Sequence, residues 1–194
     1  MSYLRNFEYT IVPEDSYQII RNCSVCKGKS IFASCGKFRL NANGNRIDVW
    51  LIYQCKKCKH TYNLTIYERR KADNFLPGQI KGFMENDKAL AKKYGTDKSL
   101  FVRNKAEVDW SSIKYQIINN KNQQPVTENM TAYKSGDCIQ ISNPFGLNIR
   151  ADKIIADILS LTRSRVKQRQ KDGEIEIAEN RPDNNINITI YGDI

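Results

Sequence analysis

The chain contains 194 residues, with 31 Lys and Arg against 21 Asp and Glu, which gives a formal net charge of +10. Its hydrophobic content of 40% argues against intrinsic disorder, and no apolar run approaches the roughly 18 residues of a membrane span. With a single histidine the chain offers no credible Ser/His/Asp catalytic set, and its basic surplus is compatible with a polyanionic partner.

The first eight residues lack the apolar segment of a secretory signal peptide. We therefore expect a cytoplasmic protein with reduced cysteines. In that compartment a spaced set of cysteines indicates metal binding rather than disulfide bonds.

Two Cys-x-x-Cys pairs follow, Cys23/Cys26 and Cys55/Cys58, with 28 residues between them. Two thiolates three positions apart can point into one tight turn, and two such turns supply the four-sulfur shell that suits Zn²⁺. The pairs therefore predict one structural zinc, and the lysines around them favour the thiolate form.

Other interpretations of the cysteines stay open. One pair could be a redox motif, and His60 could replace one of the four sulfurs. Cys35 and Cys138 have no partner by spacing, so we expect both to be small buried hydrophobic side chains.

The segment between the pairs has the pattern of an antiparallel sheet. Residues 31–40 are strand-like, Asn43-Gly44 is a strong hairpin signal, and apolar residues alternate over 47–53. A third strand, containing Tyr62, Leu64 and Ile66, follows the second cysteine pair. Residues 1–75 are therefore predicted to form a zinc-ribbon-like β domain.

The run from Phe38 to Tyr53, with its flanking cysteine pairs, resembles a bacterial domain-of-unknown-function family. The resemblance extends through most of the chain, including residues 83–97. It implies a cytoplasmic bacterial protein and no particular activity.

A central helix is predicted after residue 76, because apolar residues recur there at helical spacing and Gly95 is a natural stop. The apolar positions are Ile80, Phe83, Met84, Leu90, Ala91 and Tyr94. We expect residues 76–118 to pack on the sheet through this face. Residues 119–147 are expected to form a linker with a short strand near Cys138.

The last segment is predicted to contain two helices. Residues 151–161 have an amphipathic pattern, and Thr162 is a good N-cap for a second helix over 163–172. The second helix carries five basic residues and no acid before Asp172, with Val166 and Gln170 as its only plausible inward face. Short strands are expected at 174–177 and 186–190.

Three runs of residues 148–177 resemble the alpha-L RNA-binding motif of the ribosomal protein S-four type. They are Arg150-Ala151-Asp152-Lys153, Thr162-Arg163-Ser164-Arg165-Val166 and Asp172-Gly173. Gln170 departs from the family, which has isoleucine or leucine there. The resemblance implies that six cations face RNA phosphates: Arg150, Lys153, Arg163, Arg165, Lys167 and Arg169.

The sequence thus predicts an α+β chain: a zinc-ribbon-like sheet (1–75), a helical segment (76–118), a linker (119–147) and an alpha-L-like helix pair (148–194). The expected function is a non-enzymatic zinc protein that binds structured RNA, such as ribosomal or transfer RNA, with further contacts from Lys56, Lys57 and Lys59. Three alternatives remain: an ordinary solvated helix, a module that docks an acidic protein, and an enzyme with an exchangeable zinc.

Overall fold

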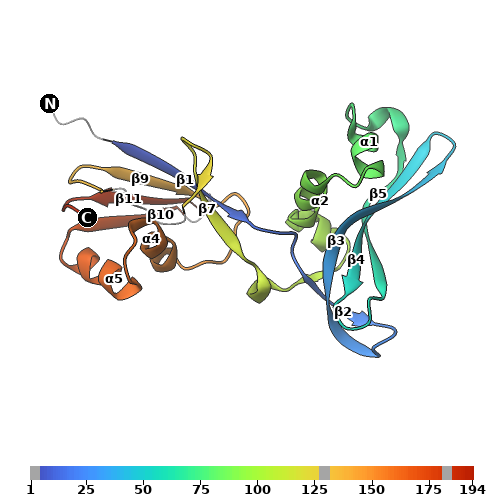
Figure 1. The fold of residues 1–194 in the computed structure, drawn as a ribbon, viewed down its shortest axis with the longest axis horizontal. Helices are drawn as coiled ribbons and strands as arrows, with labels where there is room; N and C mark the ends of the chain where they lie inside the picture. Colours follow the sequence, from blue (N-terminus) through green and yellow to red (C-terminus); the bar gives the residue numbers. More distant parts are fainter. Residues whose placement is uncertain (1–4, 127–131, 181–184) are drawn as a thin grey trace. The chain divides into compact units, whose positions relative to one another are not determined.

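The computed structural model describes residues 5–126, 132–180 and 185–194, and the chain divides into two compact units (Figure 1). One unit is the continuous segment Pro13–Lys114, and the other combines Met1–Val12 with Tyr115–Ile194. Each unit contains a sheet and helices, so the predicted α+β class is confirmed.

The sheet of the Pro13–Lys114 unit has the strand order β5-β4-β3-β2-β6, with antiparallel pairing throughout. Its strands are β2 (Ile19–Cys23), β3 (Gly28–Asn43), β4 (Arg46–Cys55), β5 (Thr61–Lys71) and β6 (Glu107–Val108). Short 3₁₀ turns lie at Ala72–Asn74 and Trp110–Ser112.

The predicted hairpin is present between β3 and β4. Asn43 pairs with Arg46, and Gly44 in the connecting turn has a φ of +57°, which glycine adopts without strain. The alternating apolar side chains of β4 are buried. The ladder is interrupted once by a bulge, where residues 35–37 of β3 lie opposite the single residue Ile52.

Our prediction of a single central helix is wrong. The segment instead forms α1 (Gln79–Met84), α2 (Lys88–Gly95) and α3 (Lys98–Arg103). The first break occurs because Asn86 adopts a left-handed φ of 56° and Asp87 then caps α2, accepting the Leu90 N–H at 2.6 Å. Met84, expected in the apolar face, is 68% exposed.

Aromatic side chains fill the core between the sheet and the three helices. The Phe83 ring of α1 packs edge-on against Phe38 of β3, at 4.9 Å between centroids, and lies 5.6 Å from Tyr94 of α2. The Phe101 ring of α3 lies 6.4 Å from Tyr53 of β4. Burial of these rings holds the short helices on the sheet.

The second unit is built on a sheet of order β10-β11-β9-β1-β7-β8, in which β1 pairs in parallel with β9. The strands are β1 (Asn6–Pro13), β7 (Tyr115–Asn119), β8 (Gln124–Pro125), β9 (Cys138–Ser142), β10 (Ile175–Asn180) and β11 (Asn185–Ile190). The predicted short strand near Cys138 is therefore present as β9.

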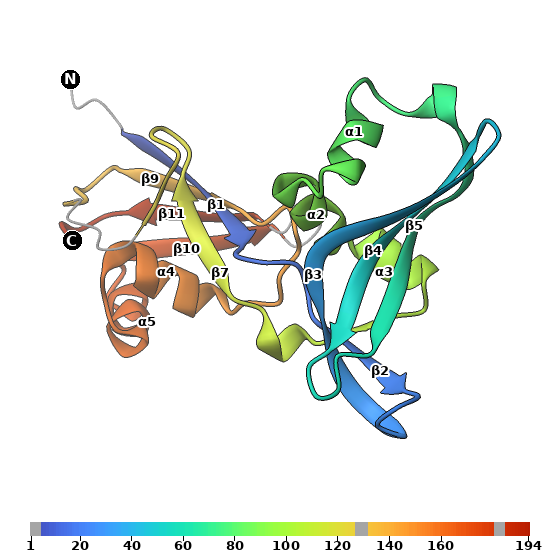
Figure 2. The same ribbon diagram turned by 45° about the vertical axis from the view of Figure 1, so that its right-hand side comes forward.

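Helices α4 (Ala151–Leu159) and α5 (Arg163–Lys171) lie on one side of this sheet in both views (Figures 1 and 2). The apolar face of α4 is buried, and α5 contributes Val166, which is fully buried. Gln170 is exposed, so our expectation that it faces inward is wrong. The N-cap prediction is confirmed, since the Thr162 hydroxyl accepts the Arg165 N–H at 3.3 Å.

The residue ranges of the two units differ from the four consecutive segments that we expected from the sequence. Residues 1–12 belong with the carboxyl-terminal part rather than with the cysteine-bearing sheet, because β1 lies between β9 and β7 in the other sheet. Residues 119–126 and 132–147, expected as a linker, contribute β8, β9 and the end of β7 to that same sheet.

Candidate metal centre and basic surface

Two turns at one end of the Pro13–Lys114 sheet carry the paired cysteines. Cys23 ends β2 and Cys55 ends β4, and both strands pair antiparallel with β3. The β2–β3 turn and the β4–β5 turn therefore lie at the same end of β3. Lys27 and Lys59, one residue past the second cysteine of each pair, have left-handed φ angles of 52° and 64° and close the two turns.

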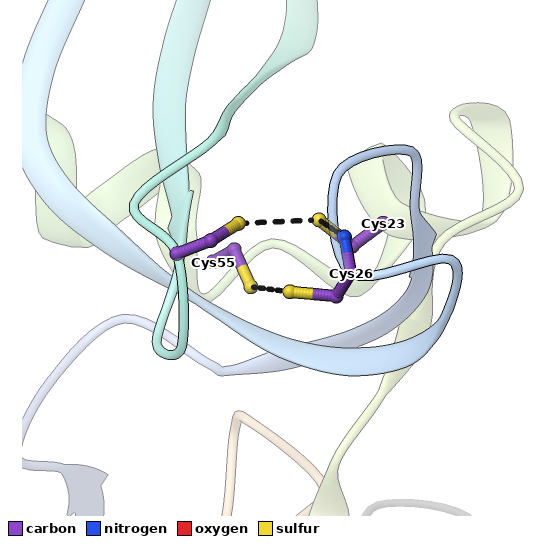
Figure 3. A group of neighbouring side chains, drawn as sticks. Cys23, Cys26 and Cys55 are labelled. Atoms are coloured by element: carbon purple, nitrogen blue, oxygen red, sulfur yellow. Dashed lines mark hydrogen bonds between the residues drawn. The ribbon is translucent and has the colours of Figure 1, made fainter.

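The four sulfur atoms converge. The Sγ atoms of Cys23 and Cys58 are 3.5 Å apart, those of Cys26 and Cys55 are 3.9 Å apart, and all four lie within 4.8 Å of one another. Figure 3 shows Cys23 and Cys26 of one turn facing Cys55 on the other. Bond lengths of about 2.3 Å in a tetrahedral ZnS₄ shell give sulfur separations of roughly 3.8 Å, so the cysteines are positioned to hold a metal ion.

The thiols of this cluster have unequal acidities. The backbone N–H of Cys58 donates to the Cys55 sulfur and, against the effect of burial, lowers the pKa of Cys55 to about 6. The hydrogen bond with Cys58 and burial raise the pKa of Cys26 to about 12. A bound metal ion would remove this inequality, because it deprotonates each coordinating thiol.

His60 and the remaining two cysteines are not part of the cluster that the described residues form. The His60 Nε2 atom lies 3.2 Å from the Ser24 hydroxyl, on the exposed side of the turns. Cys35 and Cys138 are half-buried rather than fully buried. The Cys35 thiol donates to the carbonyl of Ile52 at 3.3 Å.

The basic residues of the helix pair surround one carboxylate. Arg150, the N-cap residue of α4, and Arg163, the first residue of α5, donate to Asp152 at 2.9 and 3.1 Å, and the Lys167 ammonium lies 3.9 Å away. Burial would raise the pKa of Asp152, but hydrogen bonds from the two arginines outweigh it and hold the pKa below its ordinary value. Asp152 therefore supplies part of the counter-charge that the cations of α5 require.

The other predicted cations have different surroundings. The Lys153 ammonium lies 5.1 Å from the centroid of the Tyr115 ring, and Arg165 is exposed. Arg169 is the exception, because its side chain is 17% exposed and its guanidinium donates to the Glu174 carboxylate at 2.8 Å. We refer to the five exposed cations below as the basic surface: Arg150, Lys153, Arg163, Arg165 and Lys167.

The net charge belongs to one unit. Residues 13–114 contain 20 Lys and Arg against 10 Asp and Glu, whereas the other unit contains 11 of each. The cysteine-bearing unit thus carries the whole net charge of +10. Five exposed lysines surround its cysteine turns: Lys27, Lys29, Lys56, Lys57 and Lys59.

Sequence reasoning missed the role of Asp152 and the ion pair of Arg5 with Asp137. Asp152 is the second residue of α4, and an acidic residue in the first turn of a helix gives no sign of contact with α5. Arg5 and Asp137 are 132 residues apart, and no local pattern connects them.

In the described part of the chain, no helix has the length and hydrophobicity to cross a membrane.

A family model described as "Protein of unknown function (DUF1062)" matches residues 40–181. The chain belongs to this family. The match confirms the resemblance to a domain-of-unknown-function family, and it includes Cys55 and Cys58 together with both helices of the basic surface. No curated protein and no solved structure matches the chain.

Proposed function

We propose that this DUF1062 protein is a non-enzymatic, cytoplasmic zinc protein that binds structured RNA through the basic surface. In this proposal Cys23, Cys26, Cys55 and Cys58 hold one Zn²⁺. The bacterial origin and the alpha-L character of the helix pair are parts of the same proposal.

The donor set supports zinc in a structural role. Four thiolates at tetrahedral spacing are the ligands of structural zinc sites, whereas catalytic sites keep one position for water or substrate. A four-sulfur shell has no such open position. The metal would join the β2–β3 turn to the β4–β5 turn and stabilise the sheet between them.

One observation carries the RNA proposal: three cations of the basic surface, one from the start of α4 and two from α5, are held together around one carboxylate. Arg150, Arg163 and Lys167 share the single carboxylate of Asp152, so two positive charges remain uncompensated at this place. Their side chains are 48–67% exposed, while Asp152 is 13% exposed. Cations fixed in this way lose little conformational entropy when they contact phosphates.

The charge of the other unit supports the same class of partner. A net charge of +10 on residues 13–114 attracts a polyanion over a distance of about 10 Å at moderate salt. Exposed Lys56, Lys57 and Lys59 would add phosphate contacts. Phosphate contacts orient a protein without reading sequence, which fits recognition of RNA by its structure.

The test replaces Arg163, Arg165 and Lys167 with alanine and measures binding of transfer RNA and of a ribosomal-RNA hairpin in a shift assay. We expect affinity to fall by about tenfold or more, because three phosphate contacts are lost. The control replaces the exposed lysines Lys81, Lys93 and Lys105 of the other unit with alanine, which changes the net charge equally. Zinc content and circular dichroism should be unchanged in both variants.

Equal losses in the two triple variants would contradict the proposal, because they would show attraction by total charge alone. Retained binding to an acidic peptide, with no binding to either RNA at moderate salt, would favour the alternative of an acidic protein partner. Metal analysis of the purified protein should give one zinc per chain.

A further inference from the structure

A cavity of about 680 Å³ lies beside the bulge of β3, within the Pro13–Lys114 unit. Residues 33–37 of β3 form one wall, and Lys88, Ala91 and Lys92 of α2 form another. Small-molecule sites in proteins have volumes of about 300–1,000 Å³, so this cavity has the size of a ligand site. It is separate from both the cysteine cluster and the basic surface.

The bulge of β3 is stabilised by its backbone conformation and by a hydrogen bond to the turn before α2. Cys35, Gly36 and Lys37 oppose only Ile52, and Gly36 has a left-handed φ of +68° that favours glycine. Beyond the bulge, the Phe38 N–H donates to the Asn86 side chain at 2.7 Å, which connects β3 to the turn before α2. Bulges of this kind turn side chains away from the regular pleat and are frequent beside binding sites.

Three lysines line the cavity, and Asp15 is the one carboxylate among its lining residues. None of the ion pairs found in the described residues involves Lys37, Lys88 or Lys92. The lining therefore has a surplus of two positive charges. A ligand with negative charge would compensate this surplus.

Two of these lysines lie on one face of α2. Lys88 is the first residue of α2, where the positive end of the helix dipole disfavours a cation. Lys92 lies four residues later on the same face, and like charges at this spacing repel. An anion bound between Lys88 and Lys92 would relieve this repulsion.

We propose that this cavity binds a small organic anion, with the anionic group at Lys37, Lys88 and Lys92 and an apolar body against Ala33 and Ala91. The proposal is independent of RNA binding, because it uses none of the residues of the basic surface. The thiol of Cys35 would lie beside the bound molecule, since Cys35 belongs to the same lining.

The probe for the test is 1-anilinonaphthalene-8-sulfonate, an anion with an apolar body, titrated by fluorescence into the full-length protein with its metal. Lys92→Glu should weaken its binding by about tenfold, because an attraction becomes a repulsion. The matched control is Lys93→Glu, which makes the same charge change on the next residue of α2, outside the cavity lining. It should weaken binding by less than about twofold. The neutral analogue N-phenyl-1-naphthylamine should bind both variants alike.

Equal effects of Lys92→Glu and Lys93→Glu on binding of the sulfonate would overturn the proposal.

A second measurement uses the unchanged protein, so it does not depend on whether a variant folds. Saturating sulfonate should slow the alkylation of Cys35 by iodoacetamide at least about fivefold, as followed by peptide mass spectrometry. Cys138 in the other unit is the internal reference and should react at an unchanged rate. Alkylation of Cys35 at the same rate with and without the probe would also overturn the proposal.

Discussion

The ion pair of Arg5 with Asp137 joins two distant parts of the chain at the scale of single residues. Asp137 is 3% exposed and accepts the Arg5 Nε–H at 2.9 Å, while the Cys138 N–H donates to the Arg5 carbonyl at 3.0 Å. The contacts lie at the start of the parallel pairing between β1 and β9. Burial would raise the pKa of Asp137, but hydrogen bonds from Arg5 and from the Lys134 N–H hold it below its ordinary value.

Replacing Arg5 with alanine should lower the free energy of unfolding at pH 7 by clearly more than the control substitution described below, because the buried carboxylate of Asp137 loses its charged partner. A lowered folded-state pKa contributes stability above the unfolded value of 3.8, and this contribution is lost as the pH falls through the folded value. The difference between wild type and variant should therefore shrink below pH 3.8. Urea unfolding at pH 7 and pH 3, followed by circular dichroism, measures both effects.

The control for this substitution is Lys121→Ala, which removes an exposed cation from the same unit. Surface substitutions of this kind usually change stability by less than about 0.5 kcal/mol. The free energies of unfolding of the wild type and of Arg5→Ala could instead differ by the same amount at pH 7 and at pH 3. That result would contradict the linkage to Asp137.

At the scale of elements, the cysteine turns are the part of the fold that a metal ion would stabilise most. The two turns contact each other through their thiols, and β3 is the strand that pairs with both β2 and β4. A bound ion would therefore hold this end of the sheet together.

Removal of the metal by a chelator, or Cys55→Ser, should therefore destabilise the Pro13–Lys114 unit by several kcal/mol. Both tryptophans of the chain, Trp50 and Trp110, belong to this unit, so their fluorescence reports on it alone. The tryptophan-detected unfolding midpoint should shift to lower denaturant. Cys35→Ser, which changes a cysteine outside the cluster, is the matched control and should shift it far less. An unchanged midpoint after chelation would show that the turns need no ion.

At the scale of the whole molecule, the division into units depends on the first strand. Residues 1–12 are separated from Tyr115 by the entire Pro13–Lys114 unit, yet they supply a strand between β9 and β7. Tyr9 and Ile11 of this strand are buried, and the Tyr9 hydroxyl lies 2.8 Å from that of Tyr133. The carboxyl-terminal unit is therefore incomplete without the start of the chain.

Deletion of residues 1–12 should unfold the sheet that contains β9, β11 and β10 while leaving the Pro13–Lys114 unit folded. Loss of a central strand exposes both neighbouring strand edges and the buried side chains that face β1. Nuclear magnetic resonance should show collapsed amide dispersion for residues 115–194 with retained signals from the other unit. Dispersed signals from both units in the deletion variant would contradict this view of the fold.

The elements that depend on local chemistry were predictable. The Cys-x-x-Cys turns, the Gly44 hairpin and the Thr162 cap follow from residues close together in sequence, since each needs only short-range hydrogen bonds or a particular φ angle. The break at Asn86 was missed because the apolar residues keep their helical spacing on both sides of it. The left-handed backbone of Asn86 leaves no trace in that spacing. Gln170 was misplaced because helical spacing shows which side chains share a face of the helix, but it does not show how much of that face the sheet covers.

The sequence by itself determined the four-cysteine set, the α+β class and the basic character of α5. Only the tertiary structure decided that β1 joins the carboxyl-terminal sheet, that Asp152 gathers three cations, and that lysines from β3 and α2 line one cavity. The physical reason is the range of the interactions. Caps, turns and metal knuckles form within a few residues, whereas strand order, shared counter-charges and cavities arise where segments far apart in the chain are packed together.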